Sequence, residues 1–558
     1  MRRVCLLSPW ILFGLWALLT IVALWARPLA PVDETRYASV AWEMWLRADW
    51  LLPHLNGTPY PDKPPLLFWL VNLAWTLAGP SDWAARMVPA VATLLALWLL
   101  SRLERLLWPQ GSDQPALSPW IFYGSVLVAP FGTSLMFDVV LTTGVLLALI
   151  GLVQAARRGG IGNWALYAFG IGIGTLTKGP VILIYLLPVA LLAPWWLPPA
   201  PRRNWWQWYR PLIVALLAGA GLALCWAIPA ARRGGAGYAD AIFLGQTAGR
   251  MVRSFQHARP WWWYLILLPA ILLPWSLWPP LWRATALLRR EAGSSERFCL
   301  AWLLPGLAGF SAISGKQVHY LIPLLPAFAL LASHVLSRAP PLPARKGAQA
   351  LVLLPWIGLG LAIAVAPTLS SIPSLNSSSI ASRMPSWVAR LSPASGLALA
   401  ALALGCAPLL RSRSGHQVLA ALTVLGTAIL YAGPVRDIVS PAYDARPLAR
   451  TIAALCADGI TVAYPGKYHG DFQFAGRLTQ PLAQFWPGTE LDWARAHPHT
   501  VLLLNYRTLS DEQRTDAILA LPYQTGETAL WHATTLIMHP EYAAGARTAG
   551  DAFRGSPE

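Results

Sequence analysis

The sequence predicts a polytopic α-helical membrane protein that carries a soluble α/β domain at its C-terminal end. Three observations support this fold class. Apolar residues make up 56% of the 558 residues and charged residues only 12%, whereas soluble domains carry about 25% charged residues. Apolar runs of about 17–22 residues recur up to position 433, and each could cross a hydrocarbon layer of ~30 Å. The composition then becomes more polar, so we expect a membrane domain over 1–433 and a second domain over 434–558.

The apolar runs define about thirteen membrane-spanning helices. Their expected ranges are 9–27, 83–102, 119–136, 138–156, 163–177, 180–197, 211–230, 262–280, 298–313, 319–337, 348–367, 394–411 and 416–433. One further apolar run, 65–79, is short and follows Pro64. A full crossing there would place the later arginine-rich loops outside, so we expect an interfacial helix in the first outer loop. The glycines at 170, 172 and 174 predict close helix packing within 163–177.

The arginines orient these helices. Arg2 and Arg3 precede the first run, and every alternate loop after it is basic. Because such residues accumulate in cytoplasmic loops, we expect a cytoplasmic N-terminus. The odd number of crossings then places 434–558 on the outer side. The net charge of +17 is explained by these loops and does not indicate nucleic-acid binding.

The tail has the pattern of a small α/β domain. The segments 459–464 and 500–505 have strand character, and 446–457 and 510–520 have helical periodicity. No internal repeat is visible, although secondary transporters are commonly built from repeats. The five cysteines show no metal-ligand spacing.

The first outer loop concentrates ionisable and phenolic side chains. They are, in order, Asp33, Glu34, Arg36, Tyr37, Tyr60, Asp62 and Lys63. The acids could serve as a general base, orient a nucleophile or hold a divalent cation, for which Asp33, Glu34 and Asp62 are the candidate ligands. The alternative is an ordinary solvated loop, or the N-terminus of an amphipathic helix, where the helix dipole favours acidic residues. No metal site is firmly predicted and no cofactor is certain.

Asp138 is the second candidate acid. It lies where two apolar runs meet. An ionisable residue at such a position is costly, so it is a functional candidate by default. The alternative is an N-cap at the outer end of 138–156.

Three cations from distant loops are expected on the outer side, namely Lys63, Arg250 and Lys316. Arginine binds phosphate through two parallel hydrogen bonds and lysine binds it as a compact charge. Together these residues suit a lipid phosphate, although each alone could extend to the headgroup layer. Lys178 precedes Gly179-Pro180, and we expect it mainly to stabilise that turn.

Several ordered motifs are similar to those of membrane glycosyltransferases of the GT-C superfamily. They are Asp33-Glu34-x-Arg36-Tyr37, Asn56-Gly57-x-Pro59-Tyr60-x-Asp62-Lys63-Pro64-Pro65, Phe137-Asp138, Leu176-Thr177-Lys178-Gly179-Pro180, Arg250 before His257 and Trp261-Trp262, and His319-Tyr320-Leu321-Ile322-Pro323. More narrowly, the chain resembles the bacterial lipid A aminoarabinose transferases (ArnT-type), which are relatives of the protein O-mannosyltransferases. The resemblance covers roughly residues 8–337 and is weaker in the tail.

The resemblance implies a GT-C fold in the bacterial inner membrane with the tail in the periplasm. The implied donor is 4-amino-4-deoxy-L-arabinose on undecaprenyl phosphate, and the implied acceptor is a lipid A phosphate, a modification tied to polymyxin resistance. Asp33 would be the main catalytic carboxylate and Asp138 its partner. The residues implied to contact the lipid phosphate or the substrate are Lys63, Arg250, Tyr320, Arg36, Tyr60 and Glu34. We also expect a monomer.

Two departures leave the sugar and the acceptor open. Asp62 stands where the family often has Glu, and Gln246 stands where it often has Glu-His. A sibling enzyme would move another polyprenyl-linked sugar to a glycolipid or a protein. A lipid transporter or flippase is the alternative from another class, but it predicts charges within spans and repeated halves, which the sequence does not show.

Overall fold

The structure, a computed structural model, describes residues 8–109, 115–198, 204–243, 258–288, 293–338, 346–370, 386–412 and 414–546. Backbone contacts divide the chain into two compact units. The first, here called the membrane unit, comprises Met1–Trp25, Pro61–Leu67 and Arg86–Pro434. The second, here called the loop–tail unit, comprises Ala26–Tyr60, Phe68–Ala85 and Val435–Glu558.

Eight helical segments in the described part of the chain are long and apolar enough to cross a membrane. They are Pro9–Ala26, Asp82–Leu107, Phe137–Arg158, Ile161–Leu191, Trp206–Gly234, Val318–Arg338, Lys346–Thr368 and Gly415–Ala457. They correspond to α1 (Pro9–Ala26), α4 (Asp82–Leu107), α7 (Phe137–Arg158), α8 (Ile161–Lys178) with α9 (Ile182–Leu191), α11 (Trp206–Gly234), η5 (Val318–Leu324) with α17 (Leu325–Arg338), α18 (Lys346–Ser370), and α21 (Gly415–Leu430) with the helices after it. The expected class, a multi-pass α-helical membrane protein, is confirmed.

Shorter helices complete the membrane unit. They are α5 (Ser118–Tyr123), α6 (Val128–Phe131), α10 (Ala193–Trp196), α12 (Ala236–Asp240), α14 (Trp263–Ile271), η4 (Trp275–Leu277), α15 (Pro279–Leu288), α16 (Ser294–Ala312), η7 (Ser386–Arg390) and α20 (Pro393–Leu409).

Two expected spans, 119–136 and 262–280, do not form single continuous helices. In the first, α5 ends where Gly124 meets α21, and a Cβ there would lie 2.6 Å from the Cα of Ala420. In the second, Pro274 and Pro279 interrupt the helical hydrogen bonds.

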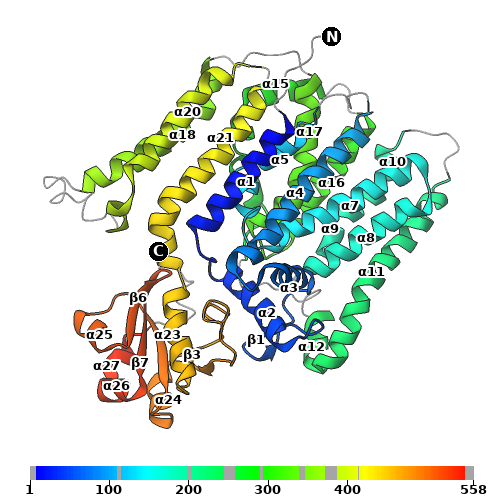
Figure 1. Ribbon diagram of the computed structural model, residues 1–558. Coiled ribbons are helices and arrows are strands. Elements are labelled where there is room, and N and C mark those ends of the chain that lie inside the picture. The colour runs from blue at the N-terminus through cyan, green and yellow to red at the C-terminus, as the bar shows by residue number, and fades with distance from the viewer. Residues whose placement is uncertain are drawn as a thin grey trace. The chain divides into compact units, whose positions relative to one another are not determined.

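Three helices of the membrane unit pack closely in a row. Helix α7 packs against α8, and α8 packs against α11 (Figure 1). Glycine permits the approach, because a Cβ on Gly170 would lie 2.5 Å from the backbone nitrogen of Ala148. The expectation of close helix packing at these glycines is therefore confirmed. In the apolar stretch of α7 that could cross a membrane, 83% is buried inside the protein. This helix can therefore carry polar groups away from lipid.

The loop–tail unit joins two parts of the chain that are far apart in sequence. From the segment between α1 and α4, the expected first outer loop, it contains α2 (Asp33–Arg47), the hairpin β1 (His54–Leu55) and β2 (Thr58–Pro59), and most of α3 (Leu66–Ala78). The hairpin turn is Asn56-Gly57, with φ of 52° and 78°, as a two-residue type I′ turn requires. A helix was expected at 65–79, and α3 occupies that position.

The tail forms a five-stranded mixed sheet with the strand order β4-β3-β5-β7-β6. The strands are β3 (Val462–Pro465), β4 (Ala483–Phe485), β5 (Val501–Tyr506), β6 (Leu519–Tyr523) and β7 (Gly526–His532). The pairs β3–β4 and β3–β5 are parallel, while β5–β7 and β6–β7 are antiparallel. The register of the central antiparallel pair places Leu503 opposite Leu530.

Helices cover both faces of this sheet. They are α23 (Arg446–Ala457), which follows η8 (Tyr431–Val439) and α22 (Ser440–Tyr443), and α24 (Glu490–Ala496), α25 (Asp511–Asp516), α26 (Ala533–Met538) and α27 (Pro540–Ala544). Along β5, Leu503 packs in the core that contains α23, and Leu504 packs in the core that contains α26. The expected α/β character of the tail is observed. The expected helix over 510–520 is too long, because Leu519 already begins β6.

Candidate functional site

The first acidic group lies at the start of α2. Asp33 and Glu34 occupy its first turn, where the helix dipole favours negative charge. Glu34 is buried, accepts a hydrogen bond from the backbone nitrogen of Ala30 at 2.9 Å and pairs with Arg27 at 2.5 Å. This carboxylate therefore holds the entry to the helix in place.

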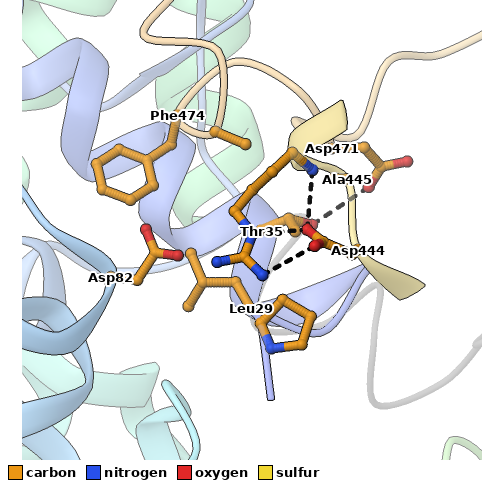
Figure 2. A pocket seen from close by; sticks show the side chains of 10 residues that line it. Leu29, Thr35, Asp82, Asp444, Ala445, Asp471 and Phe474 are labelled. Carbon is orange, nitrogen blue, oxygen red and sulfur yellow. Dashed lines mark hydrogen bonds and ion pairs between the residues drawn. The ribbon is translucent and has the colours of Figure 1, made fainter. Parts of the chain in front are cut away.

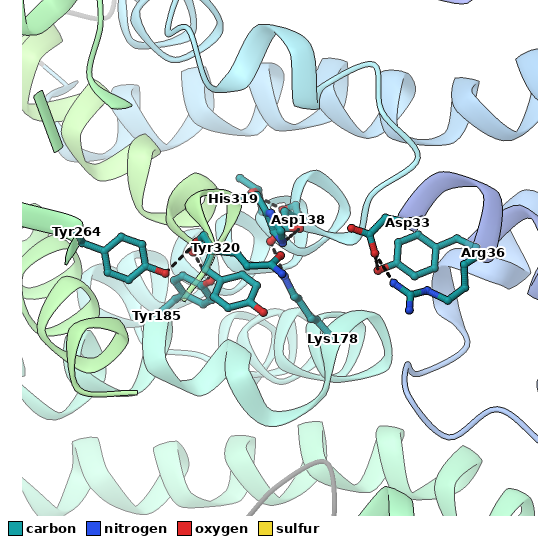
Figure 3. Close-up of polar contacts among 11 residues, drawn as sticks. Asp33, Arg36, Asp138, Lys178, Tyr185, Tyr264, His319 and Tyr320 are labelled. Carbon is teal, nitrogen blue, oxygen red and sulfur yellow. Dashed lines mark hydrogen bonds and ion pairs between the residues drawn. The ribbon is translucent and has the colours of Figure 1, made fainter. Parts of the chain in front are cut away.

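Asp33 is in a different environment. Its side chain is 40% exposed, and its Oδ1 accepts hydrogen bonds from Arg36 at 2.5 Å and from the Tyr37 hydroxyl at 3.1 Å (Figure 3). Burial lowers the pKa of Arg36, but the neighbouring phenols of Tyr60 and Tyr37 and the Asp33 carboxylate together raise it above its usual range. Arg36 therefore stays charged and orients Asp33.

Tyr60 supports this group from the hairpin side. It is buried, and its ring contacts that of Phe68 at a centroid distance of 6.3 Å. Tyr37 contacts the same Phe68 ring at 6.4 Å. Burial raises the pKa of Tyr37 well above its usual range, and Asp33 adds to the effect, so its phenol donates a hydrogen bond rather than ionising.

The second acidic group lies in the membrane unit at the start of α7. Asp138 is 1% exposed, and its Oδ1 is 2.6 Å from the Nζ of Lys178 at the end of α8 (Figure 3). The Nε2 of His319 lies 3.8 Å from its Oδ2. The N-cap of α7 is Met136, so the alternative of an N-cap at Asp138 is wrong.

Lys178 was expected mainly to stabilise a turn, and this expectation missed its partner. The ammonium pairs with Asp138 and also lies 4.4 Å from the centre of the Tyr320 ring. The Tyr320 carbonyl accepts a hydrogen bond from the Tyr185 hydroxyl at 2.8 Å. Asp138, Lys178 and Tyr320 thus bring together a buried carboxylate, a cation and a phenol. In the sequence, His319 stands out only as part of a motif.

The remaining expected cations differ in their surroundings. Lys63 lies beside the start of α7, with its Nζ 5.9 Å from the centre of the Phe137 ring, and its neighbour Asp62 is half-buried. Lys316 is buried and donates hydrogen bonds to the carbonyls of Ile313 and Arg259. Arg250, like Gln246, lies outside the described residues.

Among the described residues, no group of three or more His, Cys, Asp or Glu side chains could hold a metal ion. Glu34 pairs with Arg27, and Asp33 pairs with Arg36. The expected cation ligands Asp33, Glu34 and Asp62 therefore stay a prediction.

Comparison with solved structures identifies the fold. Over 94% of this chain and 98% of the other, the structure matches that of ArnT from Cupriavidus metallidurans bound to undecaprenyl phosphate, with a TM-score of 0.70 and 18% sequence identity. The apo state of that protein matches equally well, with the same TM-score. The chain therefore has the same fold as this ArnT.

Sequence comparison points to a narrower group. Residues 62–230 match the family model described as dolichyl-phosphate-mannose-protein mannosyltransferase. The undecaprenyl phosphate-alpha-4-amino-4-deoxy-L-arabinose arabinosyl transferase of Pseudomonas aeruginosa PAO1 is 35% identical over 54% of this chain and 55% of its own length. That of Erwinia tasmaniensis is 29% identical over 58% of each. The chain thus spans about half the length of the curated relatives it matches, and the expected resemblance to this group is confirmed.

Proposed function

We propose that this protein transfers 4-amino-4-deoxy-L-arabinose from undecaprenyl phosphate to a lipid A phosphate at the periplasmic face of the bacterial inner membrane. The observation that carries the proposal is the buried Asp138–Lys178 pair beside Tyr320. A charge pair in a membrane protein is costly and marks a working site. The similarity to undecaprenyl phosphate-alpha-4-amino-4-deoxy-L-arabinose arabinosyl transferases supports the choice of donor.

The chemistry needs one displacement at the anomeric carbon of the sugar. An oxygen of the acceptor phosphate forms the new bond to this carbon, and the bond to the oxygen of undecaprenyl phosphate breaks. The electron pair stays on the departing lipid phosphate. Since a phosphate acceptor is already anionic near neutral pH, it needs orientation more than deprotonation, and no strong base is required.

The residues then have distinct roles. Asp33 orients the reacting groups and Arg36 orients Asp33, with which it pairs directly. Lys63, Arg250 and Tyr320 contact the carrier phosphate, where positive charge stabilises the leaving group. Asp138 is the partner carboxylate. Tyr60 and Glu34 shape the substrate-binding region.

The topology belongs to the same proposal. About thirteen helices cross the membrane, α3 lies at the interface, and the tail 434–558 is a soluble periplasmic domain. The protein works as a monomer. The basic alternate loops support this orientation.

The test is complementation of a bacterial strain that lacks its own aminoarabinose transferase. The protein should restore polymyxin resistance, and mass spectrometry of lipid A should show the mass of one added aminoarabinose. A different added mass would identify the sibling activity, which the departures at Asp62 and Gln246 make the second candidate. If neither lipid A nor resistance changes, the proposal fails.

A further inference from the structure

The tail contains an irregular segment that runs along α2, the helix that carries Asp33 and Arg36. This segment, Gly470–Leu482, is here called the tail clamp. The α2 residues that contact it are Thr35, Ser39, Trp42 and Glu43, and their spacing places them on one face of the helix. Both partners belong to the loop–tail unit.

Hydrogen bonds join successive residues of the tail clamp to this face. Ser39 Oγ donates to the Gly470 carbonyl at 2.7 Å and accepts from the Phe474 backbone nitrogen at 3.2 Å. Trp42 Nε1 donates to the Leu478 carbonyl at 2.9 Å. Gln473 Nε2 donates to Glu43 Oε1 at 2.8 Å. The tail clamp therefore holds two turns of α2 in place through these hydrogen bonds.

The end of the tail clamp is attached to the β1–β2 hairpin in the same way. The Asn56 side chain accepts from the Leu482 backbone nitrogen at 2.8 Å and donates to the Leu482 carbonyl at 2.9 Å. Between these points, Phe474 stacks on Trp75 of α3 at a centroid distance of 4.8 Å. The tail clamp thus contacts every element that the first outer loop contributes to the loop–tail unit.

The tail clamp also approaches α2 closely beside Arg36. Gly470 has a φ of +85°, and a Cβ there would lie 3.2 Å from the Cα of Arg36 and 3.0 Å from the Cβ of Ser39. Next to it, Asp471 is buried and accepts a hydrogen bond from Thr35 Oγ1 at 3.2 Å (Figure 2). The backbone of the tail therefore lies directly against the turn of α2 that bears Arg36.

The other side of the tail clamp is anchored in the tail's own core. Phe472, Leu478 and Leu482 are buried in the hydrophobic cluster that contains α23 and the sheet. Because packed cores resist deformation, the segment is held rigidly on one side while it contacts α2 with the other.

We propose that the tail clamp is a positioning element of the transferase, with Gly470 and Asp471 setting the place of Arg36 and, through it, of Asp33. This inference rests on the proposed function. None of these tail residues needs to touch the substrate. Misplacing a catalytic group by about 1 Å can cost 10²-fold in rate, so small shifts of α2 are expected to lower kcat.

Gly470→Ala is the direct test, and Gly488→Ala is its matched control. Gly488 has a φ of +91° but nothing within 4 Å of its Cβ position, so both variants carry similar backbone strain and only Gly470→Ala meets α2. With purified full-length protein, undecaprenyl-phosphate-linked aminoarabinose and lipid A, Gly470→Ala should lower kcat about 10- to 100-fold. The KM for the donor should change less than kcat, and Gly488→Ala should behave as the wild type.

A double-mutant cycle with Arg36→Lys separates positioning from general damage. If Gly470 acts through Arg36, the loss caused by Gly470→Ala should be much smaller in the Arg36→Lys background. If the fold-loss in kcat of the double variant equals the product of the two single-variant losses, the inference is overturned. Equal kcat values for Gly470→Ala and Gly488→Ala would also overturn it.

If Gly470→Ala fails to fold, Ser39→Ala tests whether the tail clamp positions α2. It removes both Ser39 hydrogen bonds to the tail clamp without adding bulk, and it should lower kcat several-fold. Unchanged kcat in Ser39→Ala would then overturn the inference. Wild-type protein that transfers no sugar would instead refute the proposed function, and the positioning role with it, so the two failures are distinguishable.

Discussion

Asp138 and Lys178 form a buried ion pair at 2.6 Å, although they lie 40 residues apart on different helices. The carboxylate side chain is 1% exposed and the ammonium side chain 12%. Because each charge is removed from water, each depends on the other for compensation. The pair therefore fixes the C-terminal end of α8 to the start of α7.

Lys178→Met should destabilise the protein strongly. Removing one partner of a buried ion pair costs about 3–5 kcal/mol, because the other charge stays buried. Thermal unfolding in detergent would measure this loss. The double variant Asp138→Asn with Lys178→Met should recover part of the stability but no activity. A Lys178→Met variant as stable as the wild type would contradict the role of the pair.

Asp33→Asn should abolish sugar transfer while leaving the fold intact. The Asp33 side chain is 40% exposed, so neutralising it costs little stability, whereas loss of a carboxylate that orients the reacting groups should lower the rate by about 10²-fold. The readouts are lipid A mass and polymyxin resistance in the complementation strain. Asp492→Asn, at a position 79% exposed in α24, is the matched control. Full modification of lipid A by Asp33→Asn would refute the role given to Asp33.

Lys63→Ala should weaken use of the lipid-linked donor. A hydrogen bond to a charged group contributes about 1.5–3 kcal/mol, which corresponds to a fall in kcat/KM of roughly 10- to 100-fold. Steady-state kinetics at varied donor concentration would measure it. Lys467→Ala, at an exposed tail position, should change nothing. Donor turnover that is equal in both variants would count against a phosphate contact at Lys63.

Asp471 should give the stability of the protein a distinctive dependence on pH. Burial raises the pKa of Asp471 to about 6, although the Thr35 hydrogen bond and the charge of Arg36 oppose the effect. The folded protein thus retains a proton that the unfolded chain, with a pKa of about 3.9, releases. The contribution of protonated Asp471 to the free energy of unfolding is fully present below about pH 4. It is lost as the pH rises through about 6, and the total loss is roughly 3 kcal/mol.

Asp471→Asn should remove this dependence, because an amide does not ionise. The other charged groups near Asp471 are Arg36 on α2 and Asp82, Asp444 and Arg446, which line the same hollow (Figure 2). They remain in the variant and serve as an internal control. The melting temperatures of the wild type and of Asp471→Asn, measured at pH 4.5 and at pH 7.5, would test the prediction. If the two proteins differ in melting temperature by the same amount at both pH values, the prediction is wrong.

Composition and apolar periodicity were sufficient to predict most helices. The expected ranges 138–156 and 416–433 correspond closely to α7 and α21, because a membrane-crossing helix needs a long apolar run whether it faces lipid or neighbouring helices. The run 119–136 was misjudged as one helix. Its apolar content is high enough, but the contact between Gly124 and α21 is tertiary and leaves no signal in composition.

The sequence indicated which polar residues belong to the candidate site, but only partly which of them contact one another. Asp138 and Lys178 both stood out as charges among apolar residues, but nothing in the sequence pairs two helices. The tail clamp gave no signal at all. It has no regular periodicity, and the partners of Gly470 and Asp471 lie more than 400 positions earlier, on α2.

The sequence separation within the loop–tail unit has a consequence for biogenesis. Thr35 and Asp471 are 436 residues apart, and a ribosome that adds about 5–20 residues per second needs roughly 20–90 s to synthesise the stretch between them. Throughout this interval the nascent first loop lacks its partner. Its folding therefore ends only after nearly all of the polypeptide has been translated, and a chain truncated before residue 470 would leave the inserted protein with its first loop incompletely folded.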